Sequence, residues 1–301
     1  MDFIERLALR EPSITLQQHI PLDKYTTLRV GGPADYFAEP ASEEELKCLL
    51  DIAGEAGIPV LLMGNGSNLL VRDGGFSGLV IRLGKVFSRI EPWEGGLYAQ
   101  AGALLSVLAC EAAEASLTGL EFAQGIPGTV GGGVYMNAGA YGGELGNCIV
   151  SVTVLDHGAI RQIPGDEMDF GYRHSRAMEE GWIVLGAFFH LEKGQREQIG
   201  AAMRDYSARR KEKQPLNYPS AGSFFKRPEG HFAGALIEKA GLKGKSVGGA
   251  QVSEKHAGFL INTGGASASD FLNLMKLVQE TVQKESGVLL EPEVRIVGDD
   301  P

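Results

Sequence analysis

Apolar residues along the chain recur at helical spacing in some segments and form short continuous runs in others. Three glutamates and then apolar positions at helical spacing follow Ser42 as far as Ala53, which predicts a helix that begins with a capping box. The short apolar run Ile58–Met63 is typical of a buried parallel strand. Ser269 is a candidate N-cap of a long C-terminal helix. The other predicted helices cover residues 106–115, 199–213, 233–240 and 268–285, and the other predicted strands cover residues 25–37, 80–83, 149–155, 159–163, 182–191, 257–262 and 288–297.

The segment Gly125–Gly143 has an unusual composition, with eight glycines in nineteen positions. Glycine at this density loses much conformational entropy on folding, so a folded protein keeps it where the backbone approaches a ligand closely. Backbone amides in such a loop can bind phosphate oxygens directly. A flexible linker is the alternative, but linkers are polar, whereas this segment contains Ile126, Val130, Val134 and Met136. The composition therefore predicts a loop that faces a ligand.

A second loop with glycines, Gly64–Asn68, follows a predicted strand. It begins like a dinucleotide fingerprint, but Leu69 stands where the third glycine is required, so the Rossmann motif fails. The remaining amides, with two Asn and one Ser, suit a pyrophosphate; an ordinary tight turn is the alternative. The stretch Gly244–Ser246 ends like a P-loop, but Lys239 replaces the first glycine and no strand precedes it, so an ATPase is excluded.

Three short motifs carry side chains that can take part in chemistry. The run YRHS at 172–175 contains an arginine able to clamp a carboxylate or phosphate, although a surface arginine is the simpler interpretation. In AGSFFK a tight turn would hold the hydroxyl of Ser223, and an ordinary turn is an equal alternative. Glu293 is predicted in mid-strand beside Pro292, so its carboxylate is either exposed to solvent or buried for chemistry.

Composition limits the class of partner. The 301-residue chain is 44% hydrophobic and 22% charged, and its net charge of −10 disfavours nucleic acid and anionic membranes as partners. Its three cysteines and six histidines lack metal-binding spacing. Because no secretory signal and no apolar run of membrane length is visible, we expect a cytoplasmic protein with no metal site and reduced thiols.

Seven segments together resemble the UDP-N-acetylenolpyruvoylglucosamine reductases, flavoenzymes that make UDP-N-acetylmuramate for bacterial cell walls. They occur in family order: TTLRVGGPAD (26–35), GNGSNLLV (64–71), GIPGTVGGGVYMNAGAYGG (125–143), YRHS (172–175), AGSFFKRP (221–228), GGAQVSEKHAGFLIN (248–262) and LEPEVR (290–295). The resemblance implies an α+β protein with an FAD-binding fold of the vanillyl-alcohol-oxidase type. It implies FAD-binding subdomains at 1–85, joined by a C-terminal strand within 288–301, and at 86–195, with an α+β substrate-binding domain at 196–287.

The resemblance also implies the reaction, which is the NADPH-dependent, FAD-mediated reduction of the enolpyruvyl group of UDP-N-acetylglucosamine enolpyruvate. By motif, the catalytic residues would be Arg173, Ser223 as general acid, and Glu293. The substrate would contact Tyr172, Arg173, Lys226 and Glu293. Non-covalent FAD would be bound by Arg29, Gly64, Asn65, Gly66, Ser67, Asn68, Gly125, Ile126, Pro127, Gly128, Gly131, Gly132, Asn137, Ala138 and Gly139.

The chain is short between Leu191 and Pro215, which indicates the shorter class of the family, without the tyrosine-bearing loop. We expect a monomer or a weak oligomer. Two other functions stay open. One is an oxidase or dehydrogenase of the same fold; several of these tether the flavin through His or Cys, and neither glycine-rich loop contains one. The other is a nucleotide-binding module without activity, which would lack a flavin spectrum bleached by NADPH.

Overall fold

The computed structural model describes residues 2–300, and the chain forms two compact units. The first unit consists of Met1–Leu16, Ala38–Asn65 and Val80–Arg209, and the second consists of Gln17–Phe37, Gly66–Leu79 and Arg210–Pro301. Each unit is therefore assembled from separate stretches of sequence. The functional division at 1–85 with 288–301, 86–195 and 196–287 stays a prediction.

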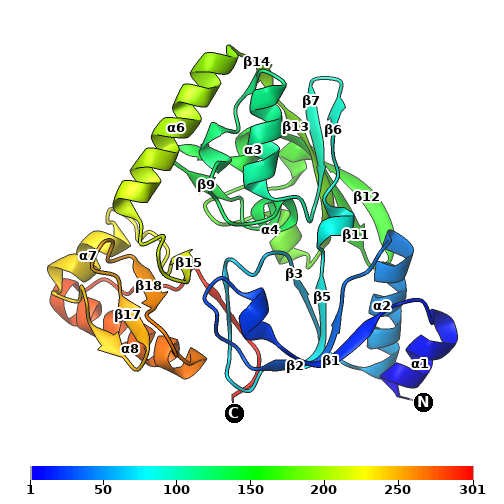
Figure 1. Ribbon diagram of the computed structural model, residues 1–301, viewed down its shortest axis with the longest axis horizontal. Coiled ribbons are helices and arrows are strands. Elements are labelled where there is room, and N and C mark those ends of the chain that lie inside the picture. The colour runs from blue at the N-terminus through cyan, green and yellow to red at the C-terminus, as the bar shows by residue number, and fades with distance from the viewer. Residues whose placement is uncertain (1, 301) are drawn as a thin grey trace. The chain divides into compact units, whose positions relative to one another are not determined.

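The centre of the first unit is a five-stranded antiparallel sheet with the strand order β12-β11-β13-β7-β6 (Figure 1). Strand β11 turns into β12 through His157 and Gly158, whose φ angles are 44° and 85°. Two residues with positive φ form a tight hairpin turn, which joins the two strands predicted over 149–155 and 159–163. The strands are β6 (Ile90–Trp93), β7 (Gly96–Gln100), β11 (Ile149–Asp156), β12 (Ala159–Pro164) and β13 (Ile183–His190).

Helices α3 and α4 pack against this sheet, and their apolar side chains share one core with β7, β11 and β13. The helices of the first unit are α1 (Phe3–Arg10), α2 (Glu43–Ala56), α3 (Leu105–Glu114), α4 (Val130–Tyr135), α5 (Arg176–Glu179) and most of α6 (Arg196–Lys213). Its short strands are β3 (Val60–Met63), β8 (Leu117–Thr118), β9 (Gly139–Ala140), β10 (Gly143–Glu144) and β14 (Glu192–Lys193). A further sheet has the order β1-β2-β5-β3, with β1 (Leu16–Pro21), β2 (Pro33–Ala38) and β5 (Phe76–Arg82).

The start of α2 shows how local sequence sets a helix boundary. The Ser42 hydroxyl accepts a hydrogen bond from the Glu45 backbone N–H at 3.2 Å, as the pattern predicts. The Glu45 carboxylate, however, accepts from the N–H of Ala41 at 2.7 Å and not from that of Ser42, so only half of the predicted capping box forms. The strand predicted at Ile58–Met63 is shorter, and only Met63 in it is buried.

The second unit contains an antiparallel sheet with the order β15-β18-β17-β16 and two helices packed on its core. Ser267 is the N-cap of α8, because its hydroxyl accepts from Asp270 N at 3.1 Å while Asp270 accepts from Ser267 N at 3.0 Å. The cap predicted at Ser269 is therefore wrong. The elements are β15 (Ser220–Ser223), β16 (Ser246–Val247), β17 (Ala250–Val252), β18 (Phe259–Asn262), α7 (Ala233–Lys239) and α8 (Ala268–Ser286).

A small parallel sheet in the second unit joins β4 (Leu69–Val71) to β19 (Arg295–Val297). The strand predicted over 288–297 is thus reduced to its last three residues. Asn68 lies at the start of this pairing: its side-chain amide donates to Glu293 O at 3.1 Å, and its own carbonyl accepts from Arg295 N at 3.0 Å. The sheet therefore places the end of the 64–68 loop beside Glu293.

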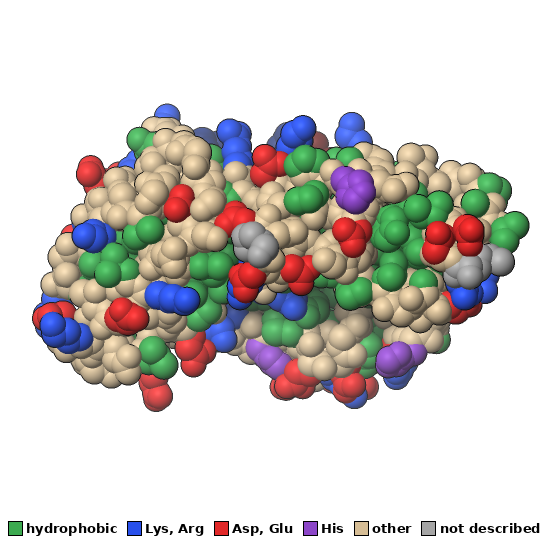
Figure 2. Space-filling view, turned by 90° about the horizontal axis from the view of Figure 1, so that it is seen from below, with side chains coloured by type: hydrophobic (Ala, Val, Ile, Leu, Met, Phe, Trp, Pro, Cys, Tyr) green, Lys and Arg blue, Asp and Glu red, His purple; other side chains and the backbone are tan. Residues whose placement is uncertain are grey.

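The surface carries charges of both signs. Figure 2 shows acidic and basic side chains interspersed over the face that it displays. Within residues 2–300, every helix is too short or too polar to serve as a membrane span.

Candidate functional site

The glycine-rich segment 125–143 is not a continuous loop, because residues 130–135 in it form helix α4. Thr129 caps this helix by accepting from Gly132 N at 3.5 Å. A Cβ on Gly131 would lie 2.8 Å from the Cβ of Ala101, and one on Gly133 would lie 2.8 Å from a methyl of Leu145. These two glycines therefore allow the helix to pack closely on its neighbours, which is a structural requirement for glycine, and the predicted contact of Gly131 with FAD stays a prediction.

Most backbone N–H groups of this segment donate hydrogen bonds inside the protein. Ile126 N donates to Ala123 O at 3.0 Å, Gly131 N to Ala101 O at 2.8 Å and Ala138 N to Gly133 O at 2.8 Å. These N–H groups are therefore already satisfied, and the segment can offer them to a phosphate only by giving up protein hydrogen bonds.

The 64–68 loop has the opposite property. Within residues 2–300, none of its backbone N–H groups donates a hydrogen bond to the protein. An anion such as a diphosphate could supply acceptors to N–H groups of this kind. The amide cradle predicted from the sequence stays a prediction, and the absence of protein acceptors for these N–H groups is consistent with it.

The two loops meet within the first unit. The Asn65 side-chain amide donates to Pro127 O at 2.7 Å. A Cβ on Gly64 would lie 2.2 Å from the Thr129 hydroxyl, so no larger residue fits at position 64 without displacing that side chain. Glycine at 64 and the Asn65 bond together fix where the 64–68 loop begins.

A cavity of about 260 Å³ adjoins this meeting point. Its volume is close to the lower end of the ~300–1,000 Å³ that is typical of small-molecule sites. Its wall is partly apolar and includes two cationic side chains, and it is formed by Gly64, Asn65, Arg82, Leu83, Gly84, Lys85, Ser88, Gly102, Ala103, Leu104, Val107 and Thr129. The residues present are compatible with a small, partly apolar anionic group.

Tyr172 and Arg173 occupy the tip of a tight turn in the first unit. Gly171 and His174 form the two backbone hydrogen bonds of an antiparallel bridge, both 3.2 Å long, and Arg173 has φ of 56°. The Arg173 guanidinium lies 4.9 Å from the centre of the Tyr172 ring and donates to Gly139 O at 3.2 Å. The turn therefore presents a partly exposed cation next to the glycine-rich segment.

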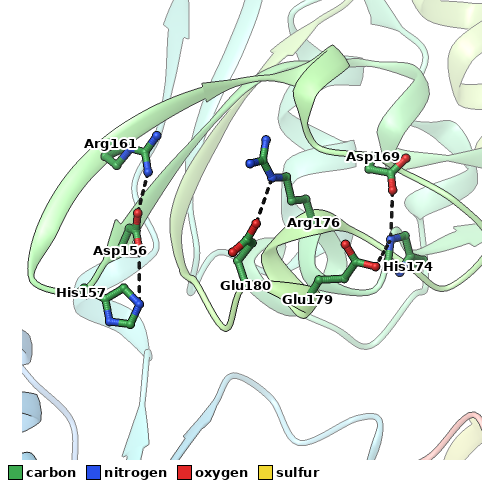
Figure 3. A network of polar contacts seen from close by, with 8 residues as sticks. All are labelled: Asp156, His157, Arg161, Asp169, His174, Arg176, Glu179 and Glu180. Carbon is green, nitrogen blue, oxygen red and sulfur yellow. Dashed lines mark hydrogen bonds and ion pairs between the residues drawn. The ribbon is translucent and has the colours of Figure 1, made fainter.

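The side chain of His174, in this turn, lies close to two carboxylates. The Nε2 atom of His174 lies 3.5 Å from an Asp169 oxygen and 3.7 Å from a Glu179 oxygen (Figure 3). These three side chains bring one nitrogen and two carboxylate oxygens within 4.8 Å of one another. Exposed acidic groups often cluster in this way, and the expectation that the protein has no metal site stays a prediction.

Ser223 and Lys226 are the two ends of the segment 223–226 in the second unit, and the two residues between them are buried in the core. Phe224 and Phe225, between them, are 0% and 2% exposed. Gly222 lies within β15, where the pairing with β18 shifts its register between Ser220 and Ser223, and its φ of 77° favours glycine, so the tight turn predicted here is an irregularity of the strand instead. The sequence therefore buries two aromatic rings and leaves the hydroxyl of Ser223 exposed.

Backbone hydrogen bonds join the segment around Glu293 to residues 223–226. Glu293 N donates to Phe224 O at 2.9 Å, and Lys226 N donates to Glu291 O at 2.8 Å. The Lys226 ammonium lies 3.4 Å from a Glu291 carboxylate oxygen. Ser223, Lys226 and Glu293 are thus neighbours in one unit, whereas Arg173 belongs to the other.

Arg29 lies in the second unit, in a turn beside the 64–68 loop. It has φ of 55°, and its neighbour Thr27 donates from its backbone N to Gly66 O at 3.2 Å. Asn262 supports this turn, because its buried side-chain amide donates to Leu28 O at 3.1 Å. Asn262 is a supporting residue that the sequence analysis missed, since its partners are more than 230 positions away.

Ser175 was also missed as a supporting residue. It is completely buried, and its hydroxyl donates to Tyr135 O at 2.8 Å. The only signal in the sequence was its place at the end of the YRHS motif.

Comparisons with known proteins cover almost the whole chain. Residues 34–160 match the family model of an FAD-binding domain, and residues 214–297 match that of the C-terminal domain of UDP-N-acetylenolpyruvoylglucosamine reductase. The reductase of this name from Agathobacter rectalis is 52% identical over 310 residues, which cover 99% of this chain and 98% of that protein. The one from Lactobacillus johnsonii is 50% identical over 297 residues, covering 98% of this chain and 99% of that protein.

Solved structures agree with these sequence relatives. The crystal structure of the reductase from Thermus caldophilus is similar with a TM-score of 0.80 at 40% identity, covering 94% of this chain and 98% of that one. A glucose oxidase variant of Phl p 4 is similar with a TM-score of 0.50 at 13% identity, over 65% of this chain and 45% of that one, which shows a shared fold alone. The predicted α+β FAD-binding fold of the vanillyl-alcohol-oxidase type is therefore confirmed.

Proposed function

Because the chain belongs to the family of UDP-N-acetylenolpyruvoylglucosamine reductases, we propose that it reduces the enolpyruvyl group of UDP-N-acetylglucosamine enolpyruvate to give UDP-N-acetylmuramate. It is an oxidoreductase with an FAD-binding domain, and in this proposal NADPH is the hydride donor and FAD is bound without a covalent link. The observation that carries the proposal is that about half of all residues are identical to those of named reductases over nearly the full length of both chains.

The 64–68 loop would hold the diphosphate of FAD through its N–H groups, which have no acceptor in the described protein. The neighbouring cavity, with Arg82 and Lys85 on its wall, would receive the adjoining nucleotide portion. Gly125, Pro127, Gly128 and the rest of the glycine-rich segment would contact the cofactor with their exposed backbone. Bound flavin supplies a ring position that accepts a hydride from one substrate and gives it to another.

The overall reaction adds a hydride to the terminal carbon of the enolpyruvyl group and a proton to the carbon that bears the carboxylate. The double bond becomes a single bond, and negative charge builds transiently on the second carbon and its carboxylate. We propose that Arg173 binds this carboxylate with two parallel hydrogen bonds, with Tyr172 flanking it. A preorganised donor of this kind contributes roughly 3 kcal/mol, by analogy with oxyanion-hole donors.

Ser223 would give its hydroxyl proton to the carbon that bears the carboxylate, as the general acid. Its hydroxyl would regain a proton from the Lys226 ammonium or from water. Glu293 would act with Ser223 and help to stabilise the developing charge. The backbone of Glu293 is bonded to that of the residue after Ser223, so the two residues lie in neighbouring segments of the second unit.

An oxidase of the same fold is the second candidate. A covalent link through cysteine would require a reactive thiolate, but burial raises the pKa of the Cys148 thiol, the cysteine next to the glycine-rich segment, to about 12. This observation disfavours a covalent flavin link through Cys148.

The test uses the purified full-length protein. We expect a flavin spectrum that NADPH bleaches, that the enolpyruvyl substrate restores quickly, and that oxygen alone restores slowly. FAD should be released on denaturation, which shows that it is not covalently bound. Rapid reoxidation by oxygen without the substrate would favour an oxidase, and a colourless protein that gains no colour with added FAD would contradict the proposal. We also propose that the enzyme is cytoplasmic and monomeric, and light scattering after size-exclusion chromatography tests the second point.

A further inference from the structure

Asn137 connects the glycine-rich segment to the turn that carries Arg173. Its side chain is fully buried, accepts from Gly146 N at 2.8 Å and donates to Gly171 O at 3.0 Å. Its φ of 42° is in the left-handed region, which asparagine enters more readily than other residues with a side chain. Position 137 therefore suits asparagine for both its backbone and its side-chain amide.

Two further hydrogen bonds link the same pair of segments. The Ser175 hydroxyl donates to Tyr135 O at 2.8 Å, and the Arg173 guanidinium donates to Gly139 O at 3.2 Å. The turn 171–175 is thus bonded to three alternate residues, 135, 137 and 139, in the segment predicted to contact the cofactor. Asn137 is the middle residue of these three, and it bonds to Gly171, the first residue of the turn.

We infer that Asn137 is a positioning residue, which holds the Arg173 turn in its binding geometry when FAD occupies the adjoining segment. Both ends of its side-chain amide are bonded within the protein, so FAD would meet its backbone and not its side chain. A cofactor that orders residues 135–139 would order the groups that hold the turn. Binding of FAD and binding of the substrate carboxylate would then favour each other, because coupling between two sites is reciprocal. The inference rests on the proposed function and adds to it the residue that couples the two sites.

Three variants separate the contributions of this residue. Asn137→Gly keeps the positive φ without strain and removes both side-chain bonds. Asn137→Asp keeps the acceptor for Gly146 N and removes the donor to Gly171 O. Asn147→Ala is the matched control, because Asn147 is an exposed asparagine nearby in the chain, in the short 3-10 helix Leu145–Asn147.

The first measurement is amide hydrogen exchange with and without FAD. In the wild type and in Asn147→Ala, we expect FAD to slow exchange in residues 125–143 and also in residues 168–178. In Asn137→Gly and Asn137→Asp, FAD should still slow exchange in 125–143 but should no longer protect 168–178. Equal protection of 168–178 in the variants and the wild type would overturn the inference, as would its absence in a wild type that binds FAD.

The second measurement is the split between the two half-reactions. Both Asn137 variants should raise the KM for the enolpyruvyl substrate roughly 10- to 100-fold, as expected for a misplaced charged donor, and this factor should exceed the factor by which they slow flavin reduction by NADPH. Slowing of both half-reactions to the same extent would indicate a general structural role and overturn the inference. A wild type that shows the coupled protection but does not reduce the substrate would instead contradict the proposed function.

Discussion

Replacing Asp73 by alanine should destabilise the second unit, because this carboxylate holds the start of its longest helix. Asp73 follows β4 in the chain and accepts three hydrogen bonds from the first turn of α8. The donors are Ala268 N at 2.7 Å, Ser269 N at 2.8 Å and the Ser269 hydroxyl at 2.6 Å. A residue 195 positions earlier in the sequence therefore satisfies N–H groups that the helix itself cannot.

The size of the effect follows from these contacts. A hydrogen bond to a charged group contributes ~1.5–3 kcal/mol net, and an anion at a helix N-terminus adds ~0.3–1 kcal/mol. The three bonds share one carboxylate that is partly exposed, and Ser267 still caps the helix, so the contributions do not add in full. We expect Asp73→Ala to lower the free energy of unfolding by ~2–4 kcal/mol, and Ser269→Ala, which removes the hydroxyl bond alone, by ~0.5–1 kcal/mol.

The effect should depend on pH in a defined direction. Burial acts to raise the pKa of Asp73, but the hydrogen bonds from Ser269 and Ala268 outweigh it and lower the pKa below its usual value. The stabilisation is therefore present above the unfolded-state pKa of about 3.9 and is lost as the pH falls through the lower pKa of the folded state. The stability difference between the wild type and Asp73→Asn should be constant near neutral pH and shrink below about pH 4.

The assay must report on the second unit. Both tryptophans, Trp93 and Trp182, lie in the first unit, so their fluorescence serves as the control signal. Urea unfolding followed by circular dichroism at 222 nm, together with hydrogen exchange of residues 268–286, measures the loss. An unchanged urea midpoint for Asp73→Ala, or a loss no larger than that of Ser269→Ala, would refute this reasoning.

Three further outcomes follow from the site. Ser223→Ala should leave flavin reduction by NADPH unchanged and slow reoxidation by the enolpyruvyl substrate ~10²- to 10⁴-fold in stopped-flow traces; equal slowing of both steps would contradict its role as general acid. Arg173→Lys should lower kcat/KM for the substrate roughly 10- to 100-fold, because an ammonium cannot form paired hydrogen bonds to a carboxylate, and a nearly wild-type value would exclude that contact. Burial raises the pKa of the Cys148 thiol to about 12, so Cys148 should resist iodoacetamide at pH 8 while exposed Cys110 is alkylated. Mass spectrometry of the treated native protein measures both, and alkylation of Cys148 before Cys110 would contradict the prediction.

Elements with local signals were predictable from the sequence. The helix after Ser42 and the long C-terminal helix occur close to where apolar spacing places them, because an amphipathic face and a cap are encoded within a few residues. Helix α4 was missed because glycine has a low helix propensity, and packing on Ala101 and Leu145 overrides that preference. Ser267 and Ser269 both suit an N-cap position. The Ser269 hydroxyl instead donates a hydrogen bond to the Asp73 carboxylate, and no local sequence pattern reveals this distant partner.

The candidate site was predictable as a set of motifs but not as a geometry. Glycine content suggested that both glycine-rich loops bind phosphate through their N–H groups. In the structure α4 and its flanks use most N–H groups of the longer segment for hydrogen bonds inside the protein, whereas those of residues 64–68 have no acceptor in the described part of the chain. The roles of Asn137 and Ser175 depend on partners between 34 and 40 positions away, so they needed the fold to become visible.

The pairing of β4 with β19 means that synthesis order and folding order differ in this protein. Leu69–Val71 emerges from the ribosome early, but its neighbour in the sheet, Arg295–Val297, is translated much later. The hydrogen bond from the side-chain amide of Asn68 likewise cannot form until Glu293, 225 positions downstream, has been synthesised. A nascent chain that stalls, or is cleaved, before this point lacks both the closing strand and the proposed charge-stabilising carboxylate. Incomplete products that lack residues 293–297 should therefore be inactive. They should also be cleaved by proteases more readily, because β4 has no partner strand in them.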